Sequence, residues 1–298
     1  MPYILSLIAA PDSAALDGDV LERAARALPW RRERPLWLAP GMAAELAFEA
    51  QKTDLDAVAE QVAAVSDGRP VDVNILPAAA RRKKLLVADM DSTMIGQECV
   101  DELADLLGLK EKVAAITERA MRGALAFEPA LRERVALLKG ITLEQIADLI
   151  RTRITPTPGA RELVHTMRAH GAYAALVSGG FTLFTEPVAA ALGFDEHRSN
   201  RLDLEGDALA GTVAEPILGR DAKRDALADL RGRLGLAPID TLAVGDGAND
   251  LAMLNEAGLG VAFRAKPAVS AAAEARIEHG DLTALLYLQG YRRDEFVS

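Results

Sequence analysis

The chain has 298 residues, half of them hydrophobic but only 4% aromatic, and it carries a formal net charge of -10. This length is enough for two domains, and the acidic excess disfavours binding to nucleic acid or to an anionic membrane surface. The single cysteine, Cys99, excludes an internal disulfide, and no apolar run is long enough to cross a bilayer. We therefore expect a cytoplasmic α/β protein with neither nucleic acid nor membrane as a partner.

Residues 1–80 predict a small α+β domain. The expected elements, in chain order, are a strand at Ile4–Ile8, a helix at Leu21–Leu28, strands at Pro35–Ala39 and Ala44–Phe48, a helix at Leu55–Val65 and a strand at Val71–Ile75. This order is that of a ferredoxin-like fold. The basic run Arg81–Lys84 that follows is interpreted as a solvated linker, with phosphate steering as the alternative.

Residues 81–298 predict a Rossmann-like parallel sheet. Four short apolar runs are typical of buried parallel strands, at Leu85–Ala88, Tyr173–Val177, Thr241–Val244 and Gly258–Ala262. Helical patterns at Arg161–Ala169 and Asp250–Glu256 separate them, and Leu202–Val213 predicts a hairpin. A wholly helical stretch at about residues 97–155 interrupts the first strand–helix unit, so we expect an inserted cap.

Polar segments follow three of these strands directly. They are Asp89-Met90-Asp91, Ser178-Gly179-Gly180 and Gly245–Asp250. Ligands of open parallel sheets bind beyond the carboxyl ends of the strands, so we expect the three segments to meet in one crevice.

The residue types suit phosphoryl transfer. Asp89 can attack phosphorus and form an acyl phosphate, which divides one difficult hydrolysis into two easier steps. Asp91, two positions on, can donate a proton to the leaving alkoxide and then take one from water.

A hard dication would let two anions approach each other, because Mg²⁺ prefers carboxylate, carbonyl and phosphate oxygens. The expected ligands are the carboxylates of Asp89 and Asp246 and the backbone carbonyl of Asp91, with Asp250 acting through water. The expected phosphate contacts are the Lys223 ammonium, the Ser178 hydroxyl, the Gly179 backbone N–H and the Asn249 side chain.

Taken alone, each segment is weak evidence. Asp-x-Asp pairs and Ser-Gly-Gly commonly form turns, and Gly-Asp-Gly-x-Asn-Asp also fits a calcium-type loop. The order of all three is a strong signal, because each follows its own apolar strand and a lysine lies between the second and the third.

At these residues the chain resembles the haloacid dehalogenase superfamily and, within it, the phosphoserine phosphatase family. The resemblance rests on Asp89–Ile95, Val177–Thr182, Val244–Leu251 and the cap segment Ala115–Val135. It implies the hydrolysis of O-phosphoserine to serine and phosphate, the last step of serine biosynthesis. It also implies that Glu98 contacts the substrate ammonium, Arg134 its carboxylate, and Met121 and Phe127 form an apolar lid.

The N-terminal domain resembles, loosely, the ACT-like regulatory domains of some family members. A serine-sensing role is one hypothesis, and a module for homodimer formation or for stability is favoured over it. Without the resemblance, solvated helix charges would explain Glu98 and Arg134, and ordinary packing would explain the lid.

Three other functions stay open from the sequence. A phosphotransferase would pass the phosphoryl group to a small alcohol such as homoserine. A hydrolase of another phosphomonoester is a third option, although Glu98 and Arg134 argue against a sugar phosphate. A non-catalytic amino-acid sensor is disfavoured, since it has no need for a nucleophile, an acid, a cation and a metal ligand together.

Overall fold

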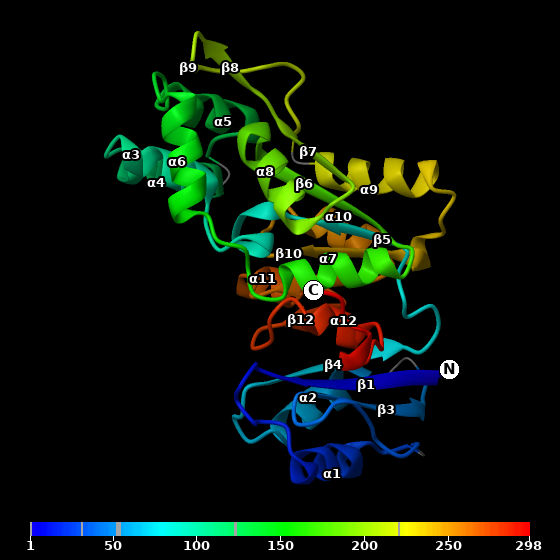
Figure 1. Ribbon diagram of the computed structural model, residues 1–298. Coiled ribbons are helices and arrows are strands. Elements are labelled where there is room, and N and C mark those ends of the chain that lie inside the picture. Colours follow the sequence, from blue (N-terminus) through cyan, green and yellow to red (C-terminus); the bar gives the residue numbers. More distant parts are fainter. Residues whose placement is uncertain (1, 31, 52–54, 122–123, 220) are drawn as a thin grey trace.

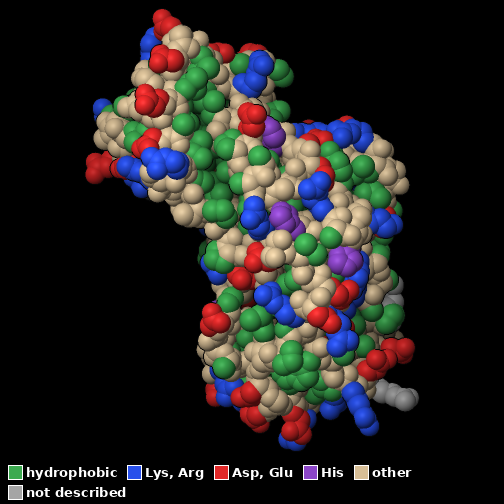
Figure 2. Space-filling view, in the orientation of Figure 1, with side chains coloured by type: hydrophobic (Ala, Val, Ile, Leu, Met, Phe, Trp, Pro, Cys, Tyr) green, Lys and Arg blue, Asp and Glu red, His purple; other side chains and the backbone are tan. Residues whose placement is uncertain are grey.

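The computed structural model describes residues 2–30, 32–51, 55–121, 124–219 and 221–298. Within these ranges the chain forms an N-terminal antiparallel sheet, a larger parallel sheet, a helical insertion and a hairpin (Figure 1). Among the helices described, none combines the length and the hydropathy that a membrane-spanning segment needs. On the face drawn in Figure 2, acidic and basic side chains are interspersed.

The N-terminal domain has the ferredoxin-like arrangement that the sequence predicts. Its strands are β1 (Pro2–Ala9), β2 (Leu36–Ala39), β3 (Ala43–Glu49) and β4 (Val71–Pro77), in the antiparallel order β2-β3-β1-β4. Helices α1 (Gly18–Ala27) and α2 (Leu55–Ala64) cover one face. Because side chains alternate along a strand, Leu5 and Leu7 pack against these helices while Ile8 joins the core of the second domain.

The second domain is built on a parallel sheet in the order β12-β11-β10-β5-β6-β7. Its strands are β5 (Leu85–Ala88), β6 (Tyr173–Phe181), β7 (Glu196–Asn200), β10 (Thr241–Gly245), β11 (Gly260–Phe263) and β12 (Ala275–Ile277). The four predicted strands are confirmed. The sequence does not predict β7 and β12, because both are short edge strands without an apolar run.

Helices cover both faces of this sheet (Figure 1). One face carries α7 (Ala160–Ala169), α8 (Thr182–Leu192) and α12 (Ala284–Leu288); the other carries α9 (Ala222–Arg233), α10 (Leu251–Glu256) and α11 (Pro267–Ser270). Leu86 of β5 packs on the first set, and its neighbours Leu85 and Val87 pack on the second. Burial on both faces explains why the strand sequence is continuously apolar.

The predicted helical insertion is confirmed and stands beyond the sheet. It consists of α3 (Cys99–Leu106), α4 (Lys110–Met121), α5 (Phe127–Ala136) and α6 (Leu143–Arg153). The predicted hairpin, β8 (Leu202–Glu205) and β9 (Ala208–Val213), reaches this cap: Gly140 N donates to Leu209 O at 2.9 Å, and Leu143 N donates to Asp207 O at 2.8 Å.

The prediction of a solvated linker is wrong for two of its four residues. Arg81 Nη1 contacts Glu45 at 2.7 Å, and its Nη2 donates to the carbonyls of Tyr287 and Leu288. Lys83 is buried, and its ammonium donates to Ile239 O at 2.9 Å. The linker runs between the two domains, so alternate side chains are enclosed while Arg82 and Lys84 stay exposed.

Two polar side chains of β4, Asp72 and Asn74, join the domains, and we call them the interdomain clasp. Asn74 donates to Arg276 O at 3.0 Å and accepts from Arg276 N at 2.9 Å. The Asp72 carboxylate accepts from the backbone N–H groups of residues 278–280. Burial raises the pKa of Asp72 despite these three donors. The clasp thus completes the hydrogen bonding of β12 and of the turn after it.

We expect Asn74→Leu to destabilise the protein without affecting its chemistry. Leucine has a similar shape but leaves the Arg276 N–H and C=O unpaired, at a cost of about 2–4 kcal/mol. Thermal unfolding should show a Tm lower by roughly 5–12 °C. Asn255→Leu, at an exposed position, is the control and should change the free energy of unfolding by no more than about 0.5 kcal/mol. An unchanged Tm for Asn74→Leu would argue against the clasp.

Candidate active site

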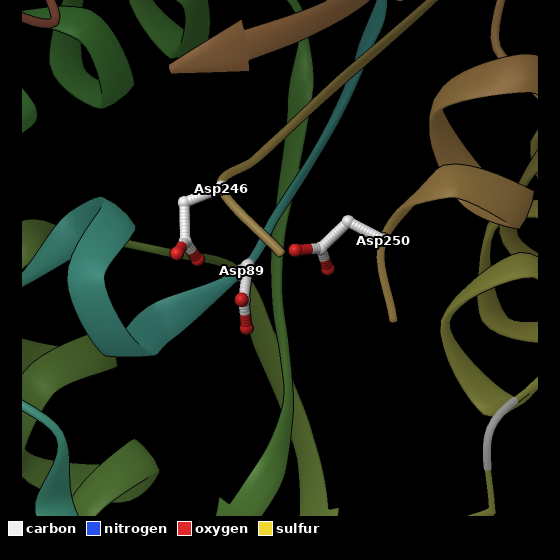
Figure 3. Close-up of side chains that lie close together, drawn as sticks. All are labelled: Asp89, Asp246 and Asp250. Carbon is white, nitrogen blue, oxygen red and sulfur yellow. The ribbon is translucent and has the colours of Figure 1, made fainter. Parts of the chain in front are cut away.

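The carboxyl ends of β5 and β10 bring separated aspartates together. These strands are parallel neighbours, and Asp89 N donates to Val244 O at 3.0 Å. Asp89 and Asp246 therefore both lie just beyond the carboxyl ends of their strands. Carboxylate oxygens of Asp89, Asp246 and Asp250 lie within 4.8 Å of one another (Figure 3). The convergence expected from the sequence is therefore present for these three residues.

Lys223 of α9 lies against this cluster. Its ammonium is 2.6 Å from Asp89 Oδ1 and 2.6 Å from Asp250 Oδ1, and its side chain is buried. Burial alone would lower the pKa of Lys223, but the two carboxylates outweigh it and raise the pKa. Burial and the charge of Asp250 raise the pKa of Asp89 well above its usual value, against the opposing effect of Lys223.

The charges of the cluster fit a divalent cation. With all three carboxylates ionised, the cluster and the one ammonium would carry an excess of two negative charges in a largely buried volume, and such an excess is stable only when compensated. Oxygen-only donors are the set that hard cations take. The backbone approaches closely here: a Cβ on Gly245 would lie 2.4 Å from Asp250 Cγ, so only glycine fits.

Asp91 is held by hydrogen bonds from two sides. It lies in the turn η2 (Met90–Met94) after Asp89. Its Oδ1 accepts from Cys99 N at 2.9 Å, and its Oδ2 accepts from Ser178 Oγ at 3.3 Å. Burial raises the pKa of Asp91 and outweighs these hydrogen bonds. A carboxyl group with a raised pKa keeps its proton more readily, as a general acid requires.

The Ser178-Gly179-Gly180 segment continues β6 instead of ending it. The sequence predicts the strand's end at Val177, but β6 runs to Phe181. Gly180 N donates to Ser178 Oγ at 2.8 Å. A Cβ on Gly180 would lie 3.0 Å from Ser178 Oγ and 3.2 Å from Asp91 Oδ2, so a side chain there would press against both.

The cap reaches this edge of the sheet through α5. The Phe127 ring lies 3.9 Å from the position of a Cβ on Gly179. Arg134, half-buried on the same helix, donates from Nε to Ala130 O at 3.3 Å and forms no ion pair with any described carboxylate. Burial lowers the pKa of Arg134, and the charges of Asp101 and Glu98 oppose this.

Glu98 lies at the start of α3 and accepts from Ser92 Oγ at 2.7 Å. Glu98 as a whole is exposed, yet other groups surround its carboxyl group closely. Desolvation and the charge of Asp91 raise the pKa of this carboxyl group to about 7. Asn249 is exposed, and in the described part of the chain it makes no hydrogen bond to Lys223. Met121 ends α4, and its side chain lies outside the described residues.

Comparison with known proteins agrees with this geometry. Residues 86–255 match the family model described as haloacid dehalogenase-like hydrolase. The chain belongs to this family. The matched residues include Asp89, Asp91, Ser178, Lys223 and Asp246.

Several relatives of this haloacid dehalogenase-like hydrolase carry a more specific name. A phosphoserine phosphatase of Albidiferax ferrireducens is 50% identical over 210 residues, covering 69% of this chain and 89% of that protein. A HAD family hydrolase of Salmonella enterica serovar Typhi superposes with a TM-score of 0.84 at 30% identity, covering 96% of this chain and 98% of that chain. A substrate-bound phosphoserine phosphatase has a TM-score of 0.64 at 41% identity, covering 69% and 98%.

In this haloacid dehalogenase-like hydrolase a further polar residue, which the sequence patterns do not indicate, lies near the site. Asn200, at the end of β7, is buried and donates to Gly179 O at 3.0 Å. The sequence does not predict this position, because β7 is Glu-His-Arg-Ser-Asn and has no apolar run. Since β7 is a parallel strand, its last residue lies at the carboxyl ends of the strands, as Asp89 and Ser178 do.

Proposed function

We propose that this haloacid dehalogenase-like hydrolase converts O-phosphoserine and water to serine and phosphate, with Asp89 as the nucleophile. One observation carries the proposal: buried Asp89 and Asp250, both in contact with Lys223, form a cluster with half-buried Asp246 where the strands end beneath the cap. The names of the curated relatives support phosphoserine as the substrate.

In the first step, an Asp89 oxygen attacks the substrate phosphorus as the bond from phosphorus to the serine oxygen breaks. Asp91 donates its proton to that oxygen, so serine leaves as a neutral alcohol. The products are an aspartyl phosphate on Asp89 and an ionised Asp91. Lys223 contacts Asp89 and Asp250 and lies where it can offset the phosphoryl charge.

In the second step, Asp91 takes a proton from water as the water oxygen attacks the phosphorus of the aspartyl phosphate. The bond between the Asp89 oxygen and phosphorus breaks, which releases phosphate and restores both side chains. The hydrogen bonds from Cys99 N and Ser178 Oγ keep the Asp91 carboxylate in place between the steps.

The acidic cluster would hold Mg²⁺ through the carboxylates of Asp89 and Asp246 and the backbone carbonyl of Asp91. Asp250, whose two oxygens accept from Lys223 Nζ and Gly247 N, would support the ion through water. The bound ion would supply positive charge that lets the carboxylate and the phosphate approach each other. Asn249 and the Gly179 N–H are proposed to bind phosphate oxygens.

The cap is proposed to recognise the serine moiety. Glu98 would bind the α-ammonium and Arg134 the α-carboxylate, since one acid and one guanidinium fork match the two ends of the substrate. Phe127, whose ring lies 3.9 Å from where a Cβ on Gly179 would be, would exclude water together with Met121. A cytoplasmic location and a homodimer formed through the N-terminal domain complete the proposal; sedimentation velocity would test the dimer.

Arg134→Gln should reduce kcat/KM for phosphoserine by about 10- to 150-fold, because a charge-assisted contact contributes about 1.5–3 kcal/mol. The loss should be small for O-phosphoethanolamine, which keeps the ammonium but lacks the carboxylate. Arg132→Gln, at an exposed position on the same helix, is the matched control. Equal losses on both substrates would show that Arg134 does not bind the carboxylate.

A phosphate-release assay with and without Mg²⁺ tests the proposed function directly. The substrates are phosphoserine, phosphothreonine, phosphohomoserine and simple sugar phosphates. We expect Mg²⁺-dependent release that is fastest from phosphoserine. Phosphorylated product in place of free phosphate when homoserine is added would indicate a phosphotransferase, and no release from any phosphoamino acid would overturn the proposal.

A further inference from the structure

Asn200 occupies an unusual position between two parts of the site. Its side chain is 1% exposed. Its Nδ2 donates to Gly179 O at 3.0 Å, and its Oδ1 accepts from Leu218 N at 2.7 Å. Leu218 lies in the loop that leads to α9, the helix carrying Lys223. One buried amide therefore ties the end of β6 to the segment that precedes the catalytic lysine.

The bonds of Asn200 continue to Asp91 in one direction. The Gly179 carbonyl belongs to the same peptide group as the Gly180 N–H, which donates to Ser178 Oγ at 2.8 Å. That hydroxyl donates to Asp91 Oδ2 at 3.3 Å. In this series of hydrogen bonds from Leu218 to Asp91, every donor is oriented toward the Asp91 carboxylate. Hydrogen bonds arranged in this way polarise and strengthen one another.

The amide orientation of Asn200 follows from its partners. An N–H group of Leu218 needs an acceptor and a carbonyl of Gly179 needs a donor, so only one arrangement of the asparagine side chain satisfies both. Neither a serine nor a carboxylate at this position would offer the same pair of groups at the same spacing. The Gly179–Gly180 peptide plane is thus fixed at its oxygen by Asn200 and at its nitrogen by Ser178.

We propose that Asn200 is a positioning residue for the general acid Asp91. It fixes the Gly179–Gly180 peptide plane, which directs the Ser178 hydroxyl at Asp91 Oδ2. The inference rests on the proposed function, because it assigns Asn200 to the proton-transfer step of that reaction. Asn200 itself touches neither the substrate nor Asp91.

Loss of this positioning should depend on the leaving group. The serine alkoxide must be protonated as it leaves, whereas the acetate released from acetyl phosphate leaves as a stable anion. The parameter kcat/KM reports steps up to formation of the phosphoenzyme, which include leaving-group departure. A misdirected Asp91 should therefore reduce kcat/KM for phosphoserine far more than for acetyl phosphate.

The experiment compares Asn200→Leu with Asn74→Leu in the full chain with Mg²⁺. Both substitutions remove one donor and one acceptor that pair with backbone groups, and both keep the side-chain shape without adding charge. We expect Asn200→Leu to lower kcat/KM for phosphoserine by about 30-fold or more, which is part of the 10²–10⁴-fold rate enhancement that general acids contribute. For acetyl phosphate the reduction in kcat/KM should be under about 3-fold. Asn74→Leu should keep wild-type kcat/KM on both.

A double-mutant cycle with Ser178→Ala on phosphoserine gives a second measurement. If Asn200 acts through Ser178, adding Asn200→Leu to Ser178→Ala should lower kcat/KM by under about 3-fold, much less than Asn200→Leu lowers it in the wild-type background. The inference would be overturned if Asn200→Leu lowered kcat/KM equally for the two substrates or left kcat/KM at the wild-type value. It would also be overturned if the two substitutions had additive effects in the cycle. Failure of the proposed function is distinct, because the wild-type chain itself would then release no phosphate from phosphoserine.

Discussion

Asp89→Asn should abolish phosphate release, with kcat lower by about four orders of magnitude or more, while the protein remains folded. Asparagine keeps the shape but cannot form the acyl phosphate. Its neutral side chain also removes the buried negative charge that burial and Asp250 disfavour, which is why the pKa of Asp89 is raised. Lys223 keeps its contact with Asp250. We therefore expect a Tm no lower than that of the wild type in the absence of metal, measured alongside phosphate release.

Asp72→Asn is the matched control, because Asp72 is also a buried aspartate but belongs to β4 of the N-terminal domain. Its amide nitrogen would face the N–H groups that the carboxylate now accepts from, so this variant should unfold at a lower temperature but keep its kcat. Turnover by Asp89→Asn above about one hundredth of wild type would remove Asp89 as the nucleophile.

Lys223→Met should impair both stability and catalysis. Removing the ammonium leaves Asp89 and Asp250 buried and uncompensated, and breaking a buried ion pair in this way costs about 3–5 kcal/mol. The kcat should fall by about 10²–10³, the usual loss when one group that stabilises transition-state charge is removed. Thermal unfolding without metal and phosphate release with Mg²⁺ measure the two effects.

Lys83→Met provides the comparison for Lys223→Met. Lys83 is a second buried lysine, and its ammonium donates to the backbone carbonyl of Ile239, just before β10, instead of contacting the acidic cluster. This variant should lose stability but keep kcat. Wild-type kcat in Lys223→Met would show that the ammonium is dispensable for phosphoryl transfer.

The parts of the fold that the sequence predicts best are those whose local pattern and tertiary environment agree. Leu85–Ala88 is a strand with the predicted bounds, because burial on both faces demands an uninterrupted apolar run. The same reasoning misses β7, whose polar residues lie at the edge of the sheet. It also ends β6 too early, since Ser178 and two glycines suggest a turn when considered without their neighbours.

The acidic cluster is predictable for the same reason that its strands are. Asp89 and Asp246 each follow an apolar run, and the geometry of a parallel sheet brings them together. Burial of Arg81 and Lys83 is not predictable, because it depends on how the domains pack. Nor is the approach of the Phe127 ring to Gly179, which brings the cap close to the sheet; the sequence indicates a lid only through the family resemblance.

The clasp has a consequence for how this molecule behaves among its own copies. β12 is a three-residue strand at the outer edge of the parallel sheet, and such an edge is a ready template for strand addition by another chain. Asn74 occupies both hydrogen-bonding groups of Arg276 that face away from β11. Besides any regulatory role, the N-terminal domain thus shields the catalytic domain from self-association and aggregation along that edge.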